Sequence, residues 1–344
     1  MRIWVIVVLA FSMIGLGHAK AEPPPRPAAS PLLARETYQF PFEDRADWLA
    51  FIAEGDGGAS AAEPYARLFS SSDYARYRAG TITRTTRFSY QNDGNTVRGI
   101  MVEPVSSGRH PVIIFNHGGV MQWGRIILAE ILEFNRLAER GYIVMASSYR
   151  GEGGSTGEPD MDGGDVADSL ALIDIAEGMP NADPQRIGMW GFSRGGLVTY
   201  GALKRTGKLA AAVIIGGPTD LVTAPRRAEF DEFVYPHVIH NYALDKDAAL
   251  KRLSPLTWVD KLAARTPILL LHGGDDPRVA PSDSLRMASA LQTQKHSYRL
   301  KIYEGGSHDL SESGLDVRSE IDRWFDLYLR DRRPAPGNGV TVIK

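Results

Sequence analysis

Residues 186–196 read RIGMWGFSRGG, and this stretch decides the fold. A short apolar run leads directly into GFSRG at 191–195, which has the Gly-x-Ser-x-Gly spacing of a sharp strand-to-helix turn. A serine can attack a carbonyl only if its hydroxyl projects from the backbone, and this turn achieves that at strained backbone angles. A plain glycine-rich turn is the alternative. Because the helix-forming run 197–204 follows at once, we favour Ser193 as a nucleophile.

Composition narrows the class of protein. The chain has 344 residues, of which 43% are hydrophobic and 23% are charged, and this suits one large α/β domain with additions. The net charge of −2 offers no electrostatic basis for binding nucleic acid or an anionic membrane surface. Since the chain has no cysteine, disulfides and a lipid anchor on a cysteine are excluded.

The first residues predict export. The basic start Met1-Arg2 precedes an apolar run at 3–16 and then Ala19-Lys20-Ala21, which fits a signal-peptide cleavage site. An uncleaved anchor is the alternative, but a spanning helix needs about 20 apolar residues, more than this run supplies. We therefore expect a signal peptide at 1–21, a periplasmic or secreted mature protein starting near Glu22, and no stable membrane anchor after cleavage.

Residues 22–80 predict a proline-rich linker followed by a small N-terminal appendage. The prolines of 22–31 favour an extended linker. Residues 40–80 are weakly helical, with a candidate apolar face around Trp48, and the stretch 55–62 interrupts them. This segment is too short to form a separate domain of any size.

From residue 81 onward, strands and helices alternate. The sequence NDGN at 92–95 predicts a hairpin turn. Asp165 is expected to cap the helix that it opens. The expected strands cover 81–90, 97–102, 111–115, 142–147, 186–190, 209–215, 267–271 and 298–303, and the expected helices cover 127–138, 165–177, 195–204 and about 321–328. Apolar strands between amphipathic helices indicate an α/β domain over 81–332, with a mostly parallel sheet covered on both faces, and a flexible tail at 333–344.

One segment departs from this alternation. Residues 220–261 separate two strands with an irregular stretch that is rich in aromatic residues, among them Phe230, Tyr242 and Trp258. Long insertions at the edge that carries the active site often cover it, so we expect a lid. Extra helices that pad the edge of the sheet are the alternative. His237 and His240 in this segment do not complete a zinc ligand set at familiar spacing.

A nucleophilic serine needs a base, and the base needs an acid that orients it. Asp275 and Asp276 follow an apolar strand that ends at Leu271, which places them at the carboxyl edge of the sheet. His308 follows the last strand on a glycine-containing loop. The chain order serine, acid, histidine is the one expected for this type of turn. From these residues alone, either aspartate fits.

With these residues in place, the chain resembles the α/β-hydrolase fold and, within it, the catalytic domain of the prolyl oligopeptidase-like serine hydrolases. The resemblance covers about residues 83–330 and is carried by YQNDG at 90–94, NHGG at 116–119 and YRGEGG at 149–154. It implies that the acid is Asp276, three residues before Val279, with Asp275 as the alternative. It also implies cleavage of an ester or amide through an acyl-enzyme on Ser193, with no cofactor and no metal.

The resemblance further implies an oxyanion hole built from backbone groups. His117 stands where prolyl oligopeptidases proper place a tyrosine, and the HGG form is similar to that of acylaminoacyl peptidases and esterases. The donors implied are the N–H groups of Arg194 and Gly119, with Val120 as the alternative to Gly119. His117, Arg278 and Tyr149 are candidates for substrate contact.

The substrate is expected to be a small molecule or a short peptide. Family peptidases carry a β-propeller or another large N-terminal domain, which residues 22–80 are too few to form. Asp231-Glu232 is the candidate clamp for a free amine. We expect a preference for small esters or N-blocked acyl compounds over dipeptidyl substrates. An acyltransferase that uses the same acyl-enzyme and a non-catalytic binding protein are the alternatives.

Overall fold

A nine-stranded sheet runs through the centre of the computed structural model, which describes residues 32–55 and 57–336. The strands lie in the order β1-β2-β3-β5-β4-β6-β7-β8-β9. Their bounds are β1 (Leu32–Thr37), β2 (Thr83–Asn92), β3 (Asn95–Pro104), β4 (His110–Asn116), β5 (Ile143–Ser147), β6 (Ala182–Phe192), β7 (Leu209–Ile215), β8 (Ile268–Gly273) and β9 (Tyr298–Tyr303). Strands β5, β4, β6, β7, β8 and β9 are parallel to one another, whereas β1, β2 and β3 pair antiparallel.

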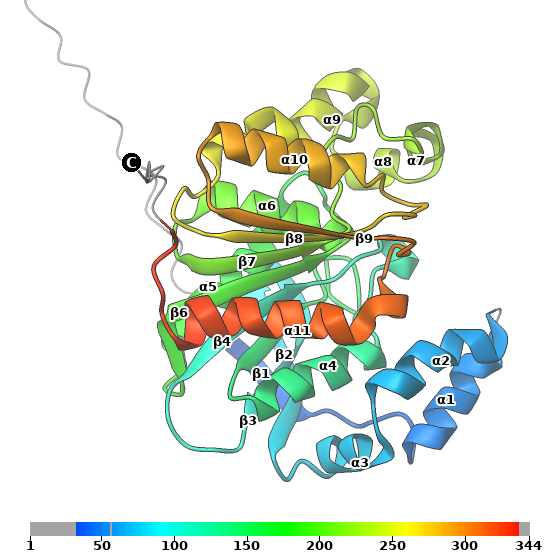
Figure 1. Ribbon diagram of the computed structural model, residues 1–344, viewed down its shortest axis with the longest axis vertical. Helices are drawn as coiled ribbons and strands as arrows, with labels where there is room; N and C mark the ends of the chain where they lie inside the picture. The colour runs from blue at the N-terminus through cyan, green and yellow to red at the C-terminus, as the bar shows by residue number, and fades with distance from the viewer. Residues whose placement is uncertain (1–31, 56, 337–344) are drawn as a thin grey trace, which may run out of the picture.

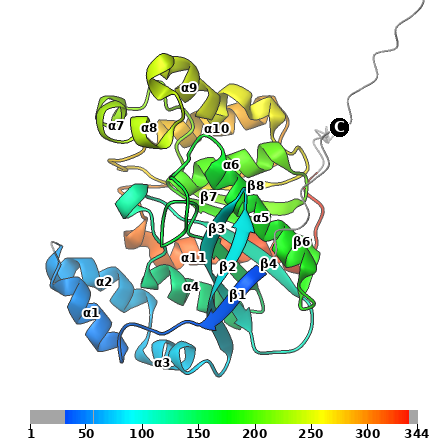
Figure 2. The ribbon, with the colours of Figure 1, turned by 180° about the vertical axis from the view of Figure 1, so that it is seen from behind.

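Helices cover both faces of this sheet. Helices α4 (Leu128–Glu139) and α11 (Gly314–Phe325) pack on one face, and α5 (Gly164–Gly178), α6 (Arg194–Arg205) and α10 (Ser282–Thr293) pack on the other. Figure 1 shows α11 and α4 in front of the sheet, and Figure 2 shows the molecule from behind. Neighbouring residues of β6 point to opposite faces, since Met189 lies in one apolar core and Trp190 in the other. The predicted α/β class is confirmed, and α10 is a helix that the sequence analysis did not identify.

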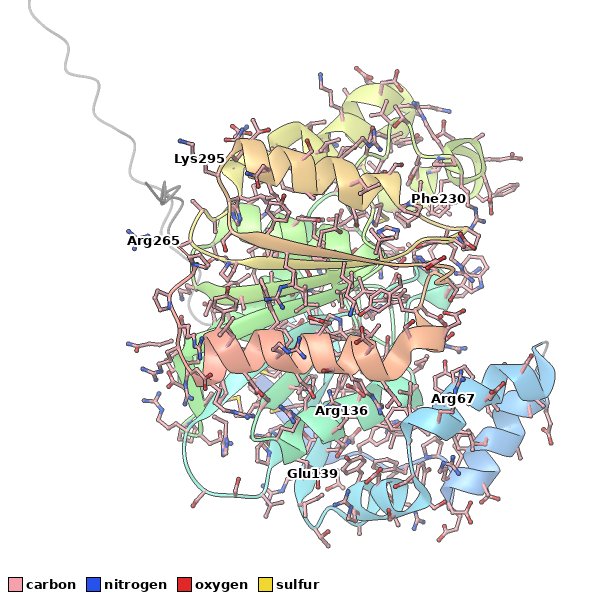
Figure 3. All side chains as sticks on the ribbon, viewed as in Figure 1. Arg67, Arg136, Glu139, Phe230, Arg265 and Lys295 are labelled. Atoms are coloured by element: carbon pink, nitrogen blue, oxygen red, sulfur yellow. The ribbon has the colours of Figure 1, made fainter. Side chains whose placement is uncertain are left out.

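The described residues also form short non-α segments. They are the 3₁₀ helices at Met121–Trp123, Tyr242–Leu244, Pro255–Lys261 and Ser311–Ser313, and a π turn at Asp326–Arg330 that extends α11. A bidentate ion pair between Arg136 and Asp322, at 2.7–2.8 Å, joins α4 to α11, and Figure 3 labels Arg136 between these two helices. The helical layer on this face is therefore held by charge as well as by apolar packing.

The N-terminal appendage, residues 32–80, is more regular than expected. Its first strand, β1, pairs antiparallel with β2 and extends the sheet by one strand. Strand β1 begins directly after the proline-rich stretch, where backbone N–H groups again become available for a ladder. Helices α1 (Arg45–Ala53), α2 (Gly58–Leu68) and α3 (Ser71–Ala79) follow. Tyr77 and Arg76 of α3 both donate to Glu139 of α4, which fixes the appendage to the main domain.

The insert, residues 220–261, is helical rather than irregular. It contains α7 (Arg227–Phe233), α8 (Tyr235–Val238) and α9 (Lys246–Leu253), drawn at the top of Figure 1. Figure 3 labels its Phe230. The insert has its own small apolar core, which also includes Val120 of the loop after β4. Phe230, Tyr235 and Tyr242 pack against one another, as in the Tyr235–Tyr242 pair at 5.5 Å between ring centroids, whereas Trp258 lies in the core of the main domain.

Some predictions fall outside the described residues. These are the signal peptide at 1–21, the linker at 22–31 and most of the tail at 333–344. Within the ranges that the structure describes, no helix combines the length and the apolar composition needed to cross a membrane.

Candidate active site

Ser193 occupies the turn between β6 and α6. Its backbone angles are φ 53° and ψ −121°, in the left-handed half of conformational space that a non-glycine residue rarely adopts. Its N–H donates to Ile215 O at 2.9 Å, which ties the turn to β7. The two flanking glycines are sterically required: a Cβ on Gly195 would lie 1.9 Å from Asn116 O, and one on Gly191 would lie 2.2 Å from Gly195 O. The predicted spacing therefore reflects a real close approach of strand and helix.

Three loops at the carboxyl edge of the sheet bring a serine, a histidine and an aspartate together. His308 Nε2 lies 2.9 Å from Ser193 Oγ, and His308 Nδ1 lies 2.7 Å from Asp276 Oδ2. The loops follow β6, β9 and β8 respectively, although the three residues are far apart in sequence. Asp276 is buried against the imidazole, whereas Asp275 is exposed. The structure places Asp276, which the resemblance favoured over Asp275, next to the histidine.

The surroundings of Asp276 keep it ionised. Burial by itself would raise the pKa of Asp276, but hydrogen bonds from His272, His308 and the N–H groups of Val279 and Arg278 outweigh burial and hold this pKa well below its usual range. The two N–H groups donate to Oδ1 at 3.0 and 2.8 Å. A permanently charged carboxylate stabilises an imidazolium and fixes the orientation of the ring.

His272 is a neighbour of this site that sequence reasoning missed. It is buried, and its Nε2 lies 3.2 Å from Asp276 Oδ2 while its Nδ1 lies 2.7 Å from Ser284 Oγ. The sequence offered a signal, because His272 directly follows the apolar strand and precedes the acidic pair by a few residues. A histidine at the end of a buried strand, four residues before an acid, is expected to lie at the same edge of the sheet as that acid.

The loop after β4 lies directly against the nucleophile. A Cβ on Gly118 would come within 3.0 Å of Ser193 Cβ, so the backbone of this loop and the turn are in contact. Asn116 anchors the loop from below, since it donates to Thr199 at 2.9 Å and accepts from Ser169 at 2.7 Å. Beside the loop, Arg194 opens α6, and the first N–H groups of a helix have no carbonyl partner within it. The backbone of the loop after β4 and the start of α6 thus both lie beside Ser193.

A buried ion cluster connects these two segments. The guanidinium of Arg194 donates to Asp165 at 2.9 Å and to Glu152 at 2.6 Å. The other oxygen of Glu152 accepts the N–H of Met121 at 2.7 Å, so one carboxylate joins the start of α6 to the loop after β4. Burial raises the pKa of Asp165 to about 7 although Arg194 opposes this rise. Glu152, which lies within the YRGEGG motif, is a structural element of the site that the sequence analysis did not assign.

The expectation that Asp165 caps its helix was wrong. Helix α5 begins one residue earlier, and its N-cap is Gly163, which makes no side-chain cap. Asp165 instead turns into the protein to pair with Arg194. The ion pair wins because a buried guanidinium without a partner costs far more free energy than an uncapped helix end.

Two of the three candidates for substrate contact are also corrected. The side chains of His117 and Tyr149 are completely buried, and their rings stack at 4.4 Å between centroids. Burial, together with the nearby Arg194, lowers the pKa of His117 to about 3, so this imidazole is neutral at physiological pH. The two rings pack inside the protein, beneath the loops after β4 and β5, and present no surface to a substrate. Arg278, the third candidate, has an exposed side chain two residues after Asp276.

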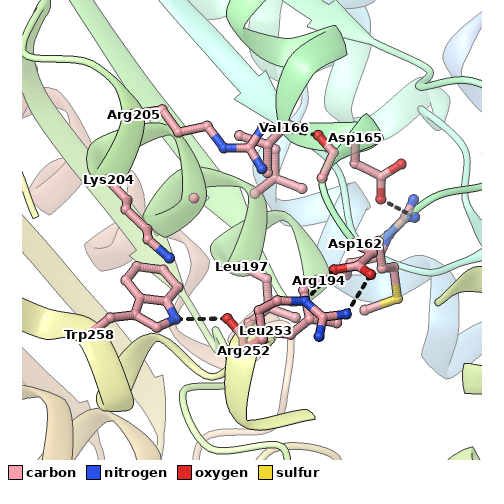
Figure 4. Close-up of a pocket in the computed structure, with 14 residues that line it drawn as sticks. Asp162, Asp165, Val166, Arg194, Leu197, Lys204, Arg205, Arg252, Leu253 and Trp258 are labelled. Carbon is pink, nitrogen blue, oxygen red and sulfur yellow. Dashed lines mark hydrogen bonds and ion pairs between the residues drawn. The ribbon is translucent and has the colours of Figure 1, made fainter. Parts of the chain in front are cut away.

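A polar pocket of about 180 Å³ lies behind α6, and Figure 4 shows the residues that line it. Its cations already have partners: Arg194 pairs with Asp165, Arg252 pairs with Asp162 at 2.6 Å, and Lys204 lies over the ring of Trp258 at 4.4 Å. Ser193, His308 and Asp276 do not line it. This pocket is therefore separate from the serine, histidine and aspartate described above.

Comparison with known proteins gives a consistent family. The sequence model of the prolyl oligopeptidase family matches residues 130–332. The uncharacterized peptidase YtmA of Bacillus subtilis (strain 168) is 28% identical over 204 residues, which are 59% of this chain and 77% of YtmA.

Two solved structures have the same fold. A Mycobacterium tuberculosis puromycin-hydrolyzing peptidase matches with a TM-score of 0.59 and 27% identity, over 69% of this chain and 38% of that one. The Pyrococcus horikoshii acylaminoacyl peptidase matches with a TM-score of 0.63 and 21% identity, over 80% of this chain and 46% of that one. The chain thus spans less than half the length of either of these two peptidases.

Proposed function

The chain belongs to the prolyl oligopeptidase family and is a serine hydrolase, and from this premise we propose that it cleaves an ester or amide bond through an acyl-enzyme on Ser193. The observation that carries this proposal is the continuous contact from Ser193 Oγ through His308 to Asp276, at 2.9 and 2.7 Å. A fluorophosphonate probe tests it, because such a probe reacts covalently with an activated serine. It should label the wild-type protein and leave Ser193→Ala unlabelled.

In the proposed mechanism, His308 accepts the proton of Ser193 as Oγ attacks the carbonyl carbon. The N–H groups of Arg194 and Gly119 donate to the oxyanion that forms, with Val120 as the alternative second donor. His308 then gives its proton to the leaving group, and the acyl group stays on Ser193. A water molecule, activated by the same imidazole, releases the acid. Asp276 stabilises the positive charge on His308 during both steps.

We further propose that the substrate is an ester or an N-blocked acyl compound rather than a dipeptide with a free amine. Asp231-Glu232, the candidate clamp for a free amine, supports this preference. Asp231 already accepts a hydrogen bond from the hydroxyl of Tyr242 at 2.5 Å and lies 3.6 Å from Arg227. Its neighbour Glu232 is exposed. An acid with these partners has less capacity left for a substrate ammonium. The Pyrococcus horikoshii protein with the same fold is an acylaminoacyl peptidase, which points in the same direction.

A substrate panel checks this preference. We expect the highest kcat/KM for a p-nitrophenyl ester of a short acid or for an N-acetylated aminoacyl anilide, because that ratio measures discrimination between substrates. A dipeptidyl anilide with a free amino terminus serves as the comparison. If that anilide exceeds every ester and every blocked substrate, the preference is wrong. Asp231→Ala and Glu232→Ala should then weaken that anilide selectively.

We also propose that the protein is exported and cleaved before Glu22, on the strength of its basic start and its short apolar run. Expression of the full chain with its own N-terminus, followed by N-terminal sequencing of the exported fraction, checks this. The expected first residue is at or near Glu22. Exported protein that still begins at Met1 would contradict cleavage.

A further inference from the structure

A large apolar cavity of about 770 Å³ lies between the N-terminal appendage and the catalytic domain. Ligand-binding pockets in proteins usually measure about 300–1,000 Å³ and are lined mainly by apolar side chains. Strands β4, β6 and β7 contribute Phe115, Trp190, Phe192 and Ile215 to its lining. Helices α1 and α2 form one wall, and α4 and α11 form the other. The cavity therefore has the size and the lining of a binding site for an apolar group.

The wall made by the appendage is firmly attached. Arg318 of α11 donates to Leu68 O at 2.5 Å, pairs with Glu133 of α4 at 2.7 Å and lies over the ring of Phe69 at 4.5 Å. Trp48 of α1 is buried and packs against Phe69 at 5.9 Å between ring centroids. Arg318 contacts Leu68 and Phe69 across the boundary between the main domain and the appendage, and Trp48 packs on Phe69, so α1 and α2 are a fixed part of the cavity.

The charged groups at the walls do not make the cavity polar. Glu133 is neutralised by Arg136 and Arg318, each at 2.7 Å. Glu130 accepts the N–H of Ile127 at 2.9 Å, and burial raises the pKa of Glu130 to about 8, so most of this carboxyl is uncharged at neutral pH. Arg125 and Asp309, the other two charged residues of the lining beside Glu130, Glu133 and Arg318, are exposed. A charged ligand thus finds no free counter-ion inside, whereas an apolar one is favoured by burial.

The cavity borders the catalytic groups on the side of the histidine. Phe192, which lines it, directly precedes Ser193, and its ring lies 5.1 Å from that of His308 between centroids. Asp309 and Leu310, which follow His308, line it as well, and no residue of the insert does. Figure 1 shows α1 and α2 on one side of the strand ends and the insert helices on the other. Ser193 and His308 do not themselves line the cavity, but the leaving group of an ester takes its proton from His308, which directly precedes two residues of the lining.

We propose that this cavity binds an apolar leaving group, the alkyl chain or aromatic ring of the alcohol portion of an ester substrate. The proposal rests on the function proposed above and adds the class of alcohol that the site prefers. In chemical terms, the acyl group is transferred to Ser193 Oγ, and the C–O bond to the alcohol breaks. The alcohol leaves with the proton from His308, and its apolar portion occupies the cavity.

Two series of esters test the leaving group and the acyl group independently, because each series lengthens only one of the two. One series runs from ethyl to hexyl acetate, and the other runs from ethyl acetate to ethyl hexanoate. For the wild-type protein we expect kcat/KM to rise roughly two- to fourfold per methylene of the alcohol, because each buried methylene contributes hydrophobic free energy. The acyl series should show a weaker dependence.

Bulky substitutions inside the cavity provide the matched comparison. Ala61→Trp on α2 and Ala129→Trp on α4 fill the cavity from opposite walls, and Ala59→Trp places the same side chain on an exposed position of α2 that does not line it. The ratio of kcat/KM for hexyl to ethyl acetate should fall at least tenfold in either cavity variant and stay within twofold in Ala59→Trp. Thermal unfolding verifies that each variant is folded. Because the two cavity variants lie on different helices, the test can still be made if one of them does not fold.

Binding of 1-naphthol to Ser193→Ala, measured by calorimetry, tests the cavity without catalysis. We expect binding that Ala61→Trp weakens at least tenfold and that Ala59→Trp leaves unchanged. If the cavity variants behave like Ala59→Trp in both assays, or if their losses fall on the acyl series, the inference is wrong. If neither an ester of either series nor any substrate of the panel is hydrolysed but 1-naphthol binds as expected, the proposed function fails and the assignment to a leaving group fails with it, while the cavity is retained as an apolar binding site.

Discussion

Ser193→Ala is expected to lower kcat by several orders of magnitude, up to about 10⁶-fold, on any substrate that the wild-type protein turns over. The alanine removes the atom that attacks the carbonyl, while His308 and Asp276 are left with nothing to activate. The fold should survive, because alanine fits where serine does and Ser193 contributes its backbone N–H to β7 whatever its side chain. Steady-state kinetics on p-nitrophenyl acetate, with thermal unfolding as the control for folding, measure both quantities.

Residual activity decides this prediction. Activity of Ser193→Ala above about one tenth of the wild-type value would remove Ser193 from the mechanism, because serine hydrolases lose far more when the nucleophile is deleted. In that case the fluorophosphonate probe should label another residue. Loss of activity together with loss of the folded state would not support the assignment, and Ser193→Cys, a volume-matched variant that keeps a nucleophilic atom, then serves as the second test.

Asp276→Asn should cost roughly 10⁴-fold in kcat, whereas Asp275→Asn should cost less than tenfold. An amide at 276 has the shape of the carboxylate but no charge, so it stabilises the imidazolium poorly and can hold the ring in the wrong tautomer. Asp275 is the matched control because it is the adjacent residue, carries the same side chain and is exposed. Its backbone N–H donates to Gly306 O at 3.0 Å, and an asparagine preserves that bond.

The pair of variants discriminates between the two aspartates directly. A crippled Asp275→Asn with a nearly unaffected Asp276→Asn would show that the loop after β8 adopts another register during catalysis. The pH profile of kcat/KM adds an independent readout. If Asp276 acts through His308, Asp276→Asn should shift the ascending limb of the profile, which a merely structural loss would leave in place.

The order of elements in the catalytic domain was readable from sequence because local patterns were strong. The apolar runs of β4, β5, β6, β7 and β8 are largely buried strands that alternate with helices, and this pattern has few other solutions. The confirmed class of enzyme followed from the same motifs. Predictions failed where local patterns were weak. Strand β1 follows a proline-rich stretch and has mostly exposed side chains, so its place in the sheet depends on pairing with β2 rather than on its own sequence.

In the active site, too, some features could be predicted from local sequence and others could not. Ser193 was identifiable because the spacing of Gly191 and Gly195 reflects a steric need that lies within a few residues of sequence. The neighbouring acids Asp275 and Asp276 were not separable by chemistry, since both are aspartates after the same strand. The resemblance favoured Asp276 by its spacing to Val279, and the path of the loop after β8, which buries Asp276 and exposes Asp275, gives the physical distinction.

By itself, the sequence determined the α/β class, the turn at Ser193 and the candidate residues for base and acid, because each depends on short-range sterics or on periodic burial. The tertiary structure alone decided which charges meet. Glu152 comes from the loop after β5 and Asp165 from the first turn of α5, and their pairing with Arg194 follows from the burial of all three groups beneath the turn. It also created the cavity between α2 and α4, which no single segment encodes. A cavity is the space left between surfaces, and its shape exists only after the appendage has docked on the sheet.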